Sequence, residues 1–436
     1  MISKVIVILI SIIFLAVLFG TKVFAIISYI LSSHVNITGS IESGPKYTLI
    51  SLLKIIAIPT YIFLLFGFQR KLKIPYKGIS FNLWLLFITY SLISYFWTPS
   101  QFLSHYVKQL GFFYAYTVGF IVIYSAWNSK SITENKIIIV LILVSILALL
   151  QTYVLGNTFG QAGNHMRLVS FTAKQQFAEF ILAIFVIVLA SKEINTKLKI
   201  VSIIAITILM ILNGSRTGFT SLVLALVVYY IFKIRRPVVT SIIPITSTVL
   251  LASGVVLSLI IFVPNITEKI YDSRIGEAIS AAQGDKIKSV GTVKDRLIIW
   301  ESVENRVQKF TFTDFVVGRG LSSGGELFQK FSLFQDAGGN RYFHNEYLRV
   351  FYELGIIGAV IFFLFLASIT VFAVKQYLWN SNPSLLVFLP GFFAFLAIEN
   401  IFSAGGNAGG MGILLVFSYS YYNAIKSTGV DRIGGY

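Results

Sequence analysis

The sequence predicts an all-α, polytopic integral membrane protein with about 12 transmembrane helices and one large, partly helical extracytoplasmic loop. Composition is the first reason. Of the 436 residues, 56% are apolar and only 12% are charged, against roughly 25% charged in soluble domains, and the mean hydropathy is +0.81. Apolar windows of about 20 residues, the length that crosses a bilayer core, recur along the chain and are the second reason. The third is a single polar stretch, 264–346, that interrupts them.

The windows expected to cross the membrane are joined by short connections. The first resembles a signal peptide, but no small-residue cleavage site follows it, so we interpret it as a span. The run at 22–31 is too short to cross and is expected to be interfacial or re-entrant. The expected spans lie at about 4–20, 47–68, 80–97, 103–125, 136–155, 171–190, 198–213, 215–234, 240–263, 347–374, 385–403 and 409–425. They divide the chain into spans one to nine (1–263), an extracytoplasmic domain (264–346), and spans ten to twelve with a cytoplasmic tail (347–436).

Basic residues are distributed unevenly between the two sets of short loops. The net charge is +17, a value that can also indicate nucleic-acid binding. Basic clusters at 70–77, 192–199 and 233–236 fall on one side, whereas the short loops of the other side hold only Lys22, Lys46, Arg167 and Arg216. Cytoplasmic loops carry an excess of Lys and Arg. The asymmetry therefore predicts that both termini are cytoplasmic, and it explains much of the positive charge without a nucleic acid as partner.

The polar segment between spans nine and ten is expected to face outward. Residues 264–345 hold ten of the chain's 18 acidic residues, and the segment is far longer than ordinary connections, which rarely exceed about 15 residues. Apolar residues recur within it at helical spacing, at Leu297, Trp300, Val303 and Val307. We therefore expect a small, partly helical domain there.

Several classes of chemistry have no support in the sequence. The chain has no cysteine, which excludes thiol nucleophiles, iron–sulfur clusters and disulfides. Its four histidines are scattered and form no zinc motif, at His34, His105, His165 and His344. No Walker signature, dinucleotide-binding glycine motif or Asp-x-Asp pair is present. We therefore expect no cofactor, no metal and no nucleotide-sugar donor.

Polar clusters are expected at three places on the outward side of the membrane. In NGSRTGF, a tight turn, Ser215 could cap the next helix while Arg216 extends to phosphate head groups. In KDRLIIW, Arg296 taken alone would be a surface charge on an amphipathic helix, with Trp300 as an interfacial anchor. Neither cluster alone indicates a reaction.

The third cluster, RYFHNEYLRVFYELG, leads into span ten. Asn345, Arg349 and Glu353 follow one another at i+4 spacing, so Arg349 and Glu353 are expected to neutralise each other inside the bundle and to support this helix. Gly355 would allow close helix packing. His344 lies where the loop meets the span, and its imidazole could act as a base near neutral pH or be a satisfied interfacial group.

In combination, these motifs resemble the O-antigen ligase and O-antigen polymerase superfamily of bacterial envelope enzymes. The elements that carry the resemblance are SRTG at 215–218, RLIIW at 296–300, GRG at 318–320, HNEYL at 344–348 and ELG at 353–355. The motifs cover the C-terminal half of the chain, and the expected topology extends the resemblance to the whole. The resemblance implies an enzyme of lipopolysaccharide or other surface-polysaccharide biosynthesis.

The resemblance also implies a reaction and its residues. Members transfer a glycan from undecaprenyl diphosphate, on the outer face of the bacterial cytoplasmic membrane, without metal or nucleotide. By this resemblance, Arg216 and Arg296 would bind and stabilise the donor diphosphate, and His344 would act as general base at the acceptor hydroxyl. Further substrate-binding residues would be Arg319, Arg341 and Asn345. Fixed guanidinium groups suit this task because they bind phosphate oxygens bidentately.

Two acceptors fit the same donor chemistry. A polymerase extends the glycan on another lipid-linked repeat unit, whereas a ligase transfers it to lipid A core, and we favour the polymerase. A flippase and a chain-length regulator are the expected protein partners. The rival from another class is a transporter of lipid-linked glycans, which the large outer domain disfavours. A scaffold role would leave the outward arginines and His344 without a purpose.

Overall fold

The computed structural model describes residues 45–68, 71–74, 78–154, 168, 174–233, 300–324, 343, 345–380, 382–398 and 408–427. Within these ranges every regular element is a helix, which confirms the all-α prediction for this part of the chain. The expected spans at 4–20 and 240–263, and the short run at 22–31, lie outside the described residues.

The helices follow the apolar windows closely. In chain order they are α2 (Pro45–Phe68), α3 (Ile79–Ile93), the 3-10 turns η1 (Ser94–Trp97) and η2 (Ser100–Phe102), α4 (Leu103–Asn128), α5 (Glu134–Leu149), the π-helical turn η3 (Leu150–Val154), α6 (Lys174–Ala190), α7 (Thr196–Asn213), α8 (Arg216–Lys233), α13 (Phe312–Val317), α15 (Glu346–Asn380), α16 (Ser384–Ile398) and α17 (Ala408–Ser427). Residues 300–307 are also helical. Every expected window inside the described ranges coincides with one of these helices.

Among the described helices, five are long and apolar enough to cross a membrane. They are Ile79–Trp97, His105–Asn128, Glu134–Tyr153, Thr196–Asn213 and Glu346–Asn380. Shorter apolar helices accompany them, at Ile56–Phe68, Gln176–Ala190, Thr217–Phe232 and Ser384–Ala397. An integral membrane protein follows from these helices, while the total of about twelve spans remains a prediction.

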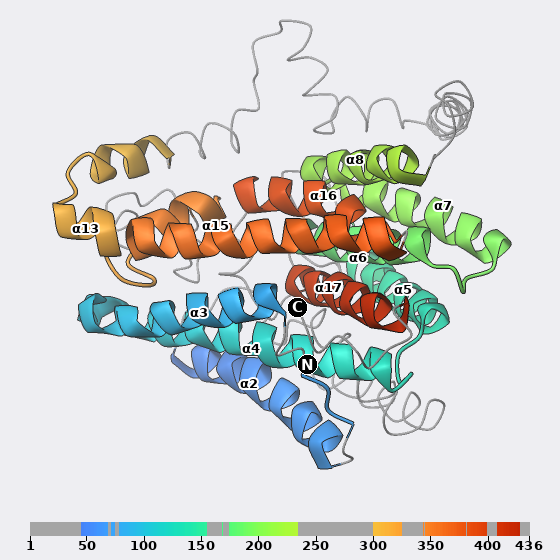
Figure 1. Ribbon diagram of the computed structural model, residues 1–436, viewed down its shortest axis with the longest axis horizontal. Helices are drawn as coiled ribbons and strands as arrows, with labels where there is room; N and C mark the ends of the chain where they lie inside the picture. Colours follow the sequence, from blue (N-terminus) through green and yellow to red (C-terminus); the bar gives the residue numbers. More distant parts are fainter. Residues whose placement is uncertain are drawn as a thin grey trace, which may run out of the picture.

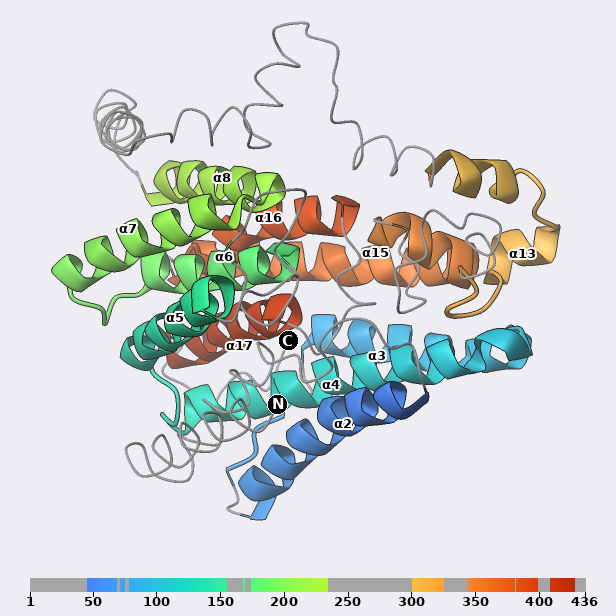
Figure 2. The same cartoon turned by 180° about the vertical axis from the view of Figure 1, so that it is seen from behind.

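The helices form one bundle around α6. Figure 1 shows α15 running across the middle, with α2, α3 and α4 on one side and α7, α8 and α16 on the other; Figure 2 shows the same order from behind. α17 packs against both α6 and α4, α16 packs against α8, and α15 packs against α3. Nearly every side chain of α6 from Phe177 to Leu189 is buried. The helix with the least access to lipid is therefore the structural centre.

Cross-helix hydrogen bonds show which helix ends lie together. Tyr377, late in α15, donates to the carbonyl of Phe232, late in α8, at 2.7 Å, so these two helices begin at the same end of the bundle. Ser368 donates to Ser80 at the start of α3 at 2.9 Å, which makes α3 antiparallel to α15. The end of α3, the start of α8 and the start of α15 therefore share one end of the bundle.

A buried carboxylate, that of Glu134, links several helices at the opposite end of the bundle. Glu134, in the first turn of α5, accepts a hydrogen bond from the hydroxyl of Tyr419 in α17 at 2.8 Å. Ser191, just after α6, donates to the other carboxylate oxygen, and the N–H of Glu193 does so at 3.2 Å. This one side chain therefore links α5, α17 and the α6–α7 loop.

Candidate functional site

α15 begins with a side-chain cap. Asn345 Oδ1 accepts the backbone N–H of Leu348 at 3.0 Å, and the Asn345 carbonyl accepts that of Arg349 at 3.1 Å. Asparagine is a preferred cap because its side chain pairs an N–H that the first turn leaves without a partner. Asn345 therefore defines the point at which the chain enters α15, one residue after His344.

A kink at Gly355 separates a short first segment of α15 from the long span. Gly355 has φ 63° and ψ −165°, which no regular helix contains. Two carbonyls beside the kink are paired by another part of the chain: the N–H of Arg319 donates to Tyr352 at 3.2 Å, and that of Gly320 donates to Glu353 at 2.8 Å. Backbone polar groups near the membrane need such partners, because an unpaired one costs several kcal/mol in hydrocarbon. The GRG segment therefore completes the hydrogen bonding of the kinked helix.

The first glycine of GRG and the last residue of ELG fit directly against each other. Gly318 also has a positive φ, 79°. A Cβ added at Gly318 would overlap the carbonyl of Glu353 and the nitrogen of Gly355, and one added at Gly355 would overlap the nitrogen of Gly318 and the carbonyl of Val316. Only glycine combines such a φ with so close an approach. The expectation that Gly355 serves close packing is therefore refined: it receives the backbone of a loop.

The residues after GRG fill the space between α15 and α3. The N–H of Leu321 donates to Ser94 Oγ at 3.2 Å, and Gly320 lies so close to Thr98 that a Cβ would overlap its side chain. The hydroxyl of Tyr90 donates to the carbonyl of Val317 at 3.4 Å. We call this assembly, residues 318–324 packed on residues 345–355, the kink junction.

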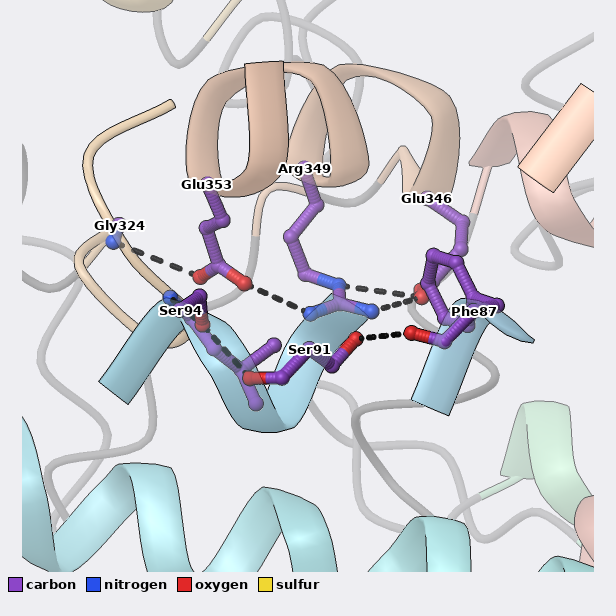
Figure 3. Close-up of polar contacts among 8 residues, drawn as sticks. Phe87, Ser91, Ser94, Gly324, Glu346, Arg349 and Glu353 are labelled. Carbon is purple, nitrogen blue, oxygen red and sulfur yellow. Dashed lines mark hydrogen bonds and ion pairs between the residues drawn. The ribbon is translucent and has the colours of Figure 1, made fainter. Parts of the chain in front are cut away.

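Three charged side chains form the interior of the kink junction. Figure 3 shows Arg349 between Glu346 and Glu353, above Ser91 and Ser94 of the α3–η1 turn. Arg349 Nε donates to Glu346 Oε1 at 3.0 Å, one terminal nitrogen pairs with the same oxygen, and the other donates to Glu353 Oε2 at 2.8 Å. All three side chains are at most 5% exposed. The predicted pairing of Arg349 with Glu353 is therefore found, and Glu346 is a further partner that the sequence interpretation missed.

The charged triad also holds the loop. Glu353 Oε1 accepts the N–H of Gly324 at 3.4 Å. Two N–H groups of the 318–324 loop are thus bonded to Glu353. That of Gly320 donates to the backbone carbonyl of Glu353, and that of Gly324 donates to its carboxylate. A buried cation between two carboxylates is stable only when its hydrogen bonds are made, and here Arg349 makes three.

Trp300, the last residue of RLIIW, contacts the segment just before His344. Its indole N–H donates to the carbonyl of Phe343 at 3.1 Å. Phe343, Val303 and Tyr352 form a small buried cluster, against which Trp300, Val307, Phe310 and Leu348 pack. The predicted apolar face of this helix is confirmed for Trp300, Val303 and Val307, while Leu297 lies outside the described residues. The RLIIW and HNEYL motifs therefore meet at Phe343.

Arg319 combines a fixed backbone with a partly exposed side chain. Its N–H is bonded to Tyr352, while its guanidinium lies 3.5 Å from Asp314 Oδ1 and its side chain is 25% exposed. Asp314 belongs to the capping box that starts α13 with Thr311. The structure thus holds Arg319 at the edge of the kink junction, with its side chain partly exposed.

In the SRTG turn, Ser215 and Gly218 have structural roles within the turn and its helices. Gly214 ends α7 with φ 63°, and Ser215 Oγ accepts the N–H of Gly218 at 3.1 Å, which confirms the capped turn expected from the sequence. A Cβ at Gly218 would lie 2.7 Å from that of Ala178, so this glycine allows α8 to pack on α6. Arg216 is the first residue of α8, at the same end of the bundle as the kink junction.

Not all residues predicted for the site can be placed. Arg296, Arg341 and His344 lie outside the described residues, and for Arg216 only the backbone is described. The structure brings together Arg319, Asn345 and Trp300 through the kink junction and the Phe343 cluster. Gly318 and Glu346 were not predicted, although the i+3 spacing of Glu346 and Arg349 is a signal that could have identified the second.

Comparison with known protein families finds a match over part of the chain. Residues 200–363 match the family described as O-antigen ligase. A search of the curated proteins found no significant match. The matched range extends from α7 to beyond the kink of α15 and includes SRTG, RLIIW, GRG, HNEYL and ELG. This domain match supports the resemblance to the O-antigen ligase and O-antigen polymerase superfamily.

Proposed function

We propose that the protein is a membrane glycosyltransferase that polymerises undecaprenyl-diphosphate-linked repeat units into O-antigen or a related surface polysaccharide. The observation that carries this proposal is the domain match, which spans all five motifs in order. The geometry supports it, because GRG, ELG and the described part of HNEYL interlock in a single junction. We place the reaction on the periplasmic face of the cytoplasmic membrane, with both termini in the cytoplasm.

The proposed reaction forms one bond and breaks one. An acceptor hydroxyl oxygen bonds to the anomeric carbon of the donor glycan, the bond from that carbon to the diphosphate oxygen breaks, and His344 takes the hydroxyl proton. Negative charge develops on the departing diphosphate, and Arg216 and Arg296 stabilise it in place of a metal. A positioned base contributes roughly 10²- to 10⁴-fold to such a step.

Burial decides which arginines can bind the donor. Arg349 is 5% exposed and paired with two carboxylates, so its guanidinium is buried away from a diphosphate. Arg319 is 25% exposed and lies 3.5 Å from the Asp314 carboxylate, a loose and partly solvated pair that a phosphate can replace. We therefore assign Arg319 to substrate binding, with Arg341 and the amide group of Asn345 as further contacts.

A second candidate is the ligase reaction, with lipid A core as acceptor. The description of the matched family, O-antigen ligase, favours it. Both reactions use the same donor and the same arginines, so they differ only in what presents the hydroxyl. A flippase that delivers the donor and a chain-length regulator are the proposed partners of the polymerase.

Deletion of the gene in its host, followed by gel analysis of the surface glycan, tests the proposal. Loss of the polymerase leaves core carrying one repeat unit. Loss of a ligase leaves full-length polymer on undecaprenyl diphosphate. An unchanged glycan would contradict both and favour a transport role.

A further inference from the structure

The kink junction is built so that two distant parts of the chain move together. Gly318 and Gly355 each have a positive φ, and a Cβ on either would overlap the backbone of the other. Two N–H groups of the loop donate to two carbonyls of the helix, at 3.2 and 2.8 Å. Contact of this kind leaves no room for sliding, since backbone atoms cannot turn aside as a side chain can. The loop and the first segment of α15 thus form one body.

Each part of that body carries a residue of the proposed site. Arg319 follows Gly318 directly, and its side chain is 25% exposed. Asn345 starts the helix segment that ends at the kink, and His344 precedes it in the sequence. The separation between the Arg319 backbone and the start of α15 is therefore set by the glycine contact and by the rigid turns between residues 346 and 354.

We propose that Gly318 and Gly355 are positioning residues of the glycosyl-transfer site: their interlocked backbones fix Arg319 relative to Asn345, the residue that caps the start of α15. The proposal rests on the proposed function, since it concerns the same site. Neither glycine touches the substrate. Both act by holding Arg319 and the Asn345 end of α15 at the separation that the transfer requires.

The charged triad braces the same unit. Glu353 accepts the N–H of Gly320 through its carbonyl and that of Gly324 through its carboxylate, and Arg349 ties that carboxylate to Glu346. The bond to the loop needs one acceptor oxygen at position 353, which Gln also supplies, and Arg349 then keeps Glu346 as its counter-ion. Glu353→Gln is therefore a conservative variant.

The test compares Gly318→Ala and Gly355→Ala with Gly67→Ala, using purified full-length protein and a lipid-diphosphate-linked donor. Gly67 is the matched control, since nothing lies within 4 Å of a Cβ added there. Misplacing a reacting group by about 1 Å can lower turnover roughly 10²-fold. We expect kcat to fall by about that factor in both junction variants with little change in the donor KM, and Gly67→Ala to match the wild type. Variants of Gly318 and Gly355 that accumulate normally and keep kcat within about twofold would overturn the proposal.

A distance measurement separates lost positioning from other defects. The chain has no cysteine, so Thr313→Cys on α13 and Val360→Cys on α15, both exposed, can carry a pair of spin labels without background. We expect one narrow distance in the wild type and in Gly67→Ala, and a broadened or displaced distribution in the junction variants. An unchanged distribution in both variants would also overturn the proposal.

Two further comparisons are needed. One applies if the alanine variants fail to fold, and the other tests whether the proposed site is correct. Should the alanine variants not accumulate, Glu353→Gln and Glu353→Ala decide. Gln keeps one acceptor oxygen for the N–H of Gly324 and is expected to retain more of kcat than Ala, which is expected to lose it with a broadened label distance. Equal kcat in the two would overturn the positioning role. Full activity of His344→Ala would instead refute the proposed site itself. Loss in His344→Ala with normal junction variants would leave the function standing and remove the positioning role.

Discussion

Trp300 donates its indole N–H to the backbone carbonyl of Phe343 at 3.1 Å. The two residues belong to segments 43 positions apart, and each adjoins a predicted functional motif. Phe343 is also buried with Tyr352, in the turn of α15 whose carbonyl accepts Arg319. A single network thus connects RLIIW, GRG and the start of α15.

Trp300→Phe is expected to weaken this network. The ring still packs on Val303 and Phe343, but the carbonyl of Phe343 loses its donor, which costs about 1–2 kcal/mol. The free energy of unfolding in detergent should fall by that amount, and glycan transfer should fall with it. Trp379→Phe is the control, because Trp379 is 60% exposed. Equal stability of the two variants would show that the Trp300 hydrogen bond contributes nothing.

Removing Arg349 alone is expected to be more harmful than neutralising the whole triad. Arg349→Met leaves two buried carboxylates without a counter-ion, and breaking a buried pair in this way costs about 3–5 kcal/mol. The triple variant Glu346→Gln, Arg349→Met, Glu353→Gln has no buried charge and should recover most of the loss. Membrane accumulation and unfolding midpoints measure both. A triple variant less stable than Arg349→Met would contradict a purely electrostatic origin of the loss.

At the opposite end of the bundle, stability and activity are expected to separate. Tyr419→Phe removes the 2.8 Å hydrogen bond to the buried Glu134 carboxylate and should lower the free energy of unfolding by about 1–3 kcal/mol. Because this contact lies at the end away from the kink junction, transfer per folded molecule should be unchanged. A tenfold lower kcat at full occupancy would indicate that the site extends across the bundle.

Chelation is expected to have no effect on the proposed transfer. In the proposed mechanism, arginine guanidinium groups take the role that a divalent ion plays elsewhere, so activity of purified protein in excess EDTA should equal that in buffer. Donor turnover assayed with and without the chelator checks this. Activity lost in EDTA and restored by a divalent ion would overturn the metal-free mechanism.

Much of the fold follows from hydropathy. A bilayer core requires about 20 apolar residues per crossing, and this requirement places helices at the windows regardless of which side chains fill them. The ion pair of Arg349 and Glu353 could also be predicted from the sequence, because helical spacing alone brings i and i+4 side chains together. Both features depend on local periodicity.

The kink junction could not be predicted in this way. Gly355 sits in an apolar helical pattern with nothing to signal a positive φ, and its partner Gly318 comes from a separate segment of the chain. Their contact depends on the tertiary approach of two backbones, and such an approach produces no periodic pattern in the sequence. The double role of Glu353, as carbonyl and carboxylate acceptor for the loop, is hidden for the same reason.

The most direct test of the central claim is glycan transfer by purified protein in vesicles containing an undecaprenyl-diphosphate-linked repeat unit. Wild-type protein is expected to lengthen the glycan and release undecaprenyl diphosphate, while Arg216→Ala, Arg296→Ala and His344→Ala, folded and present in equal amounts, release none. Release of undecaprenyl diphosphate by all three variants at the wild-type rate, or none by the wild type with either acceptor, would contradict the account.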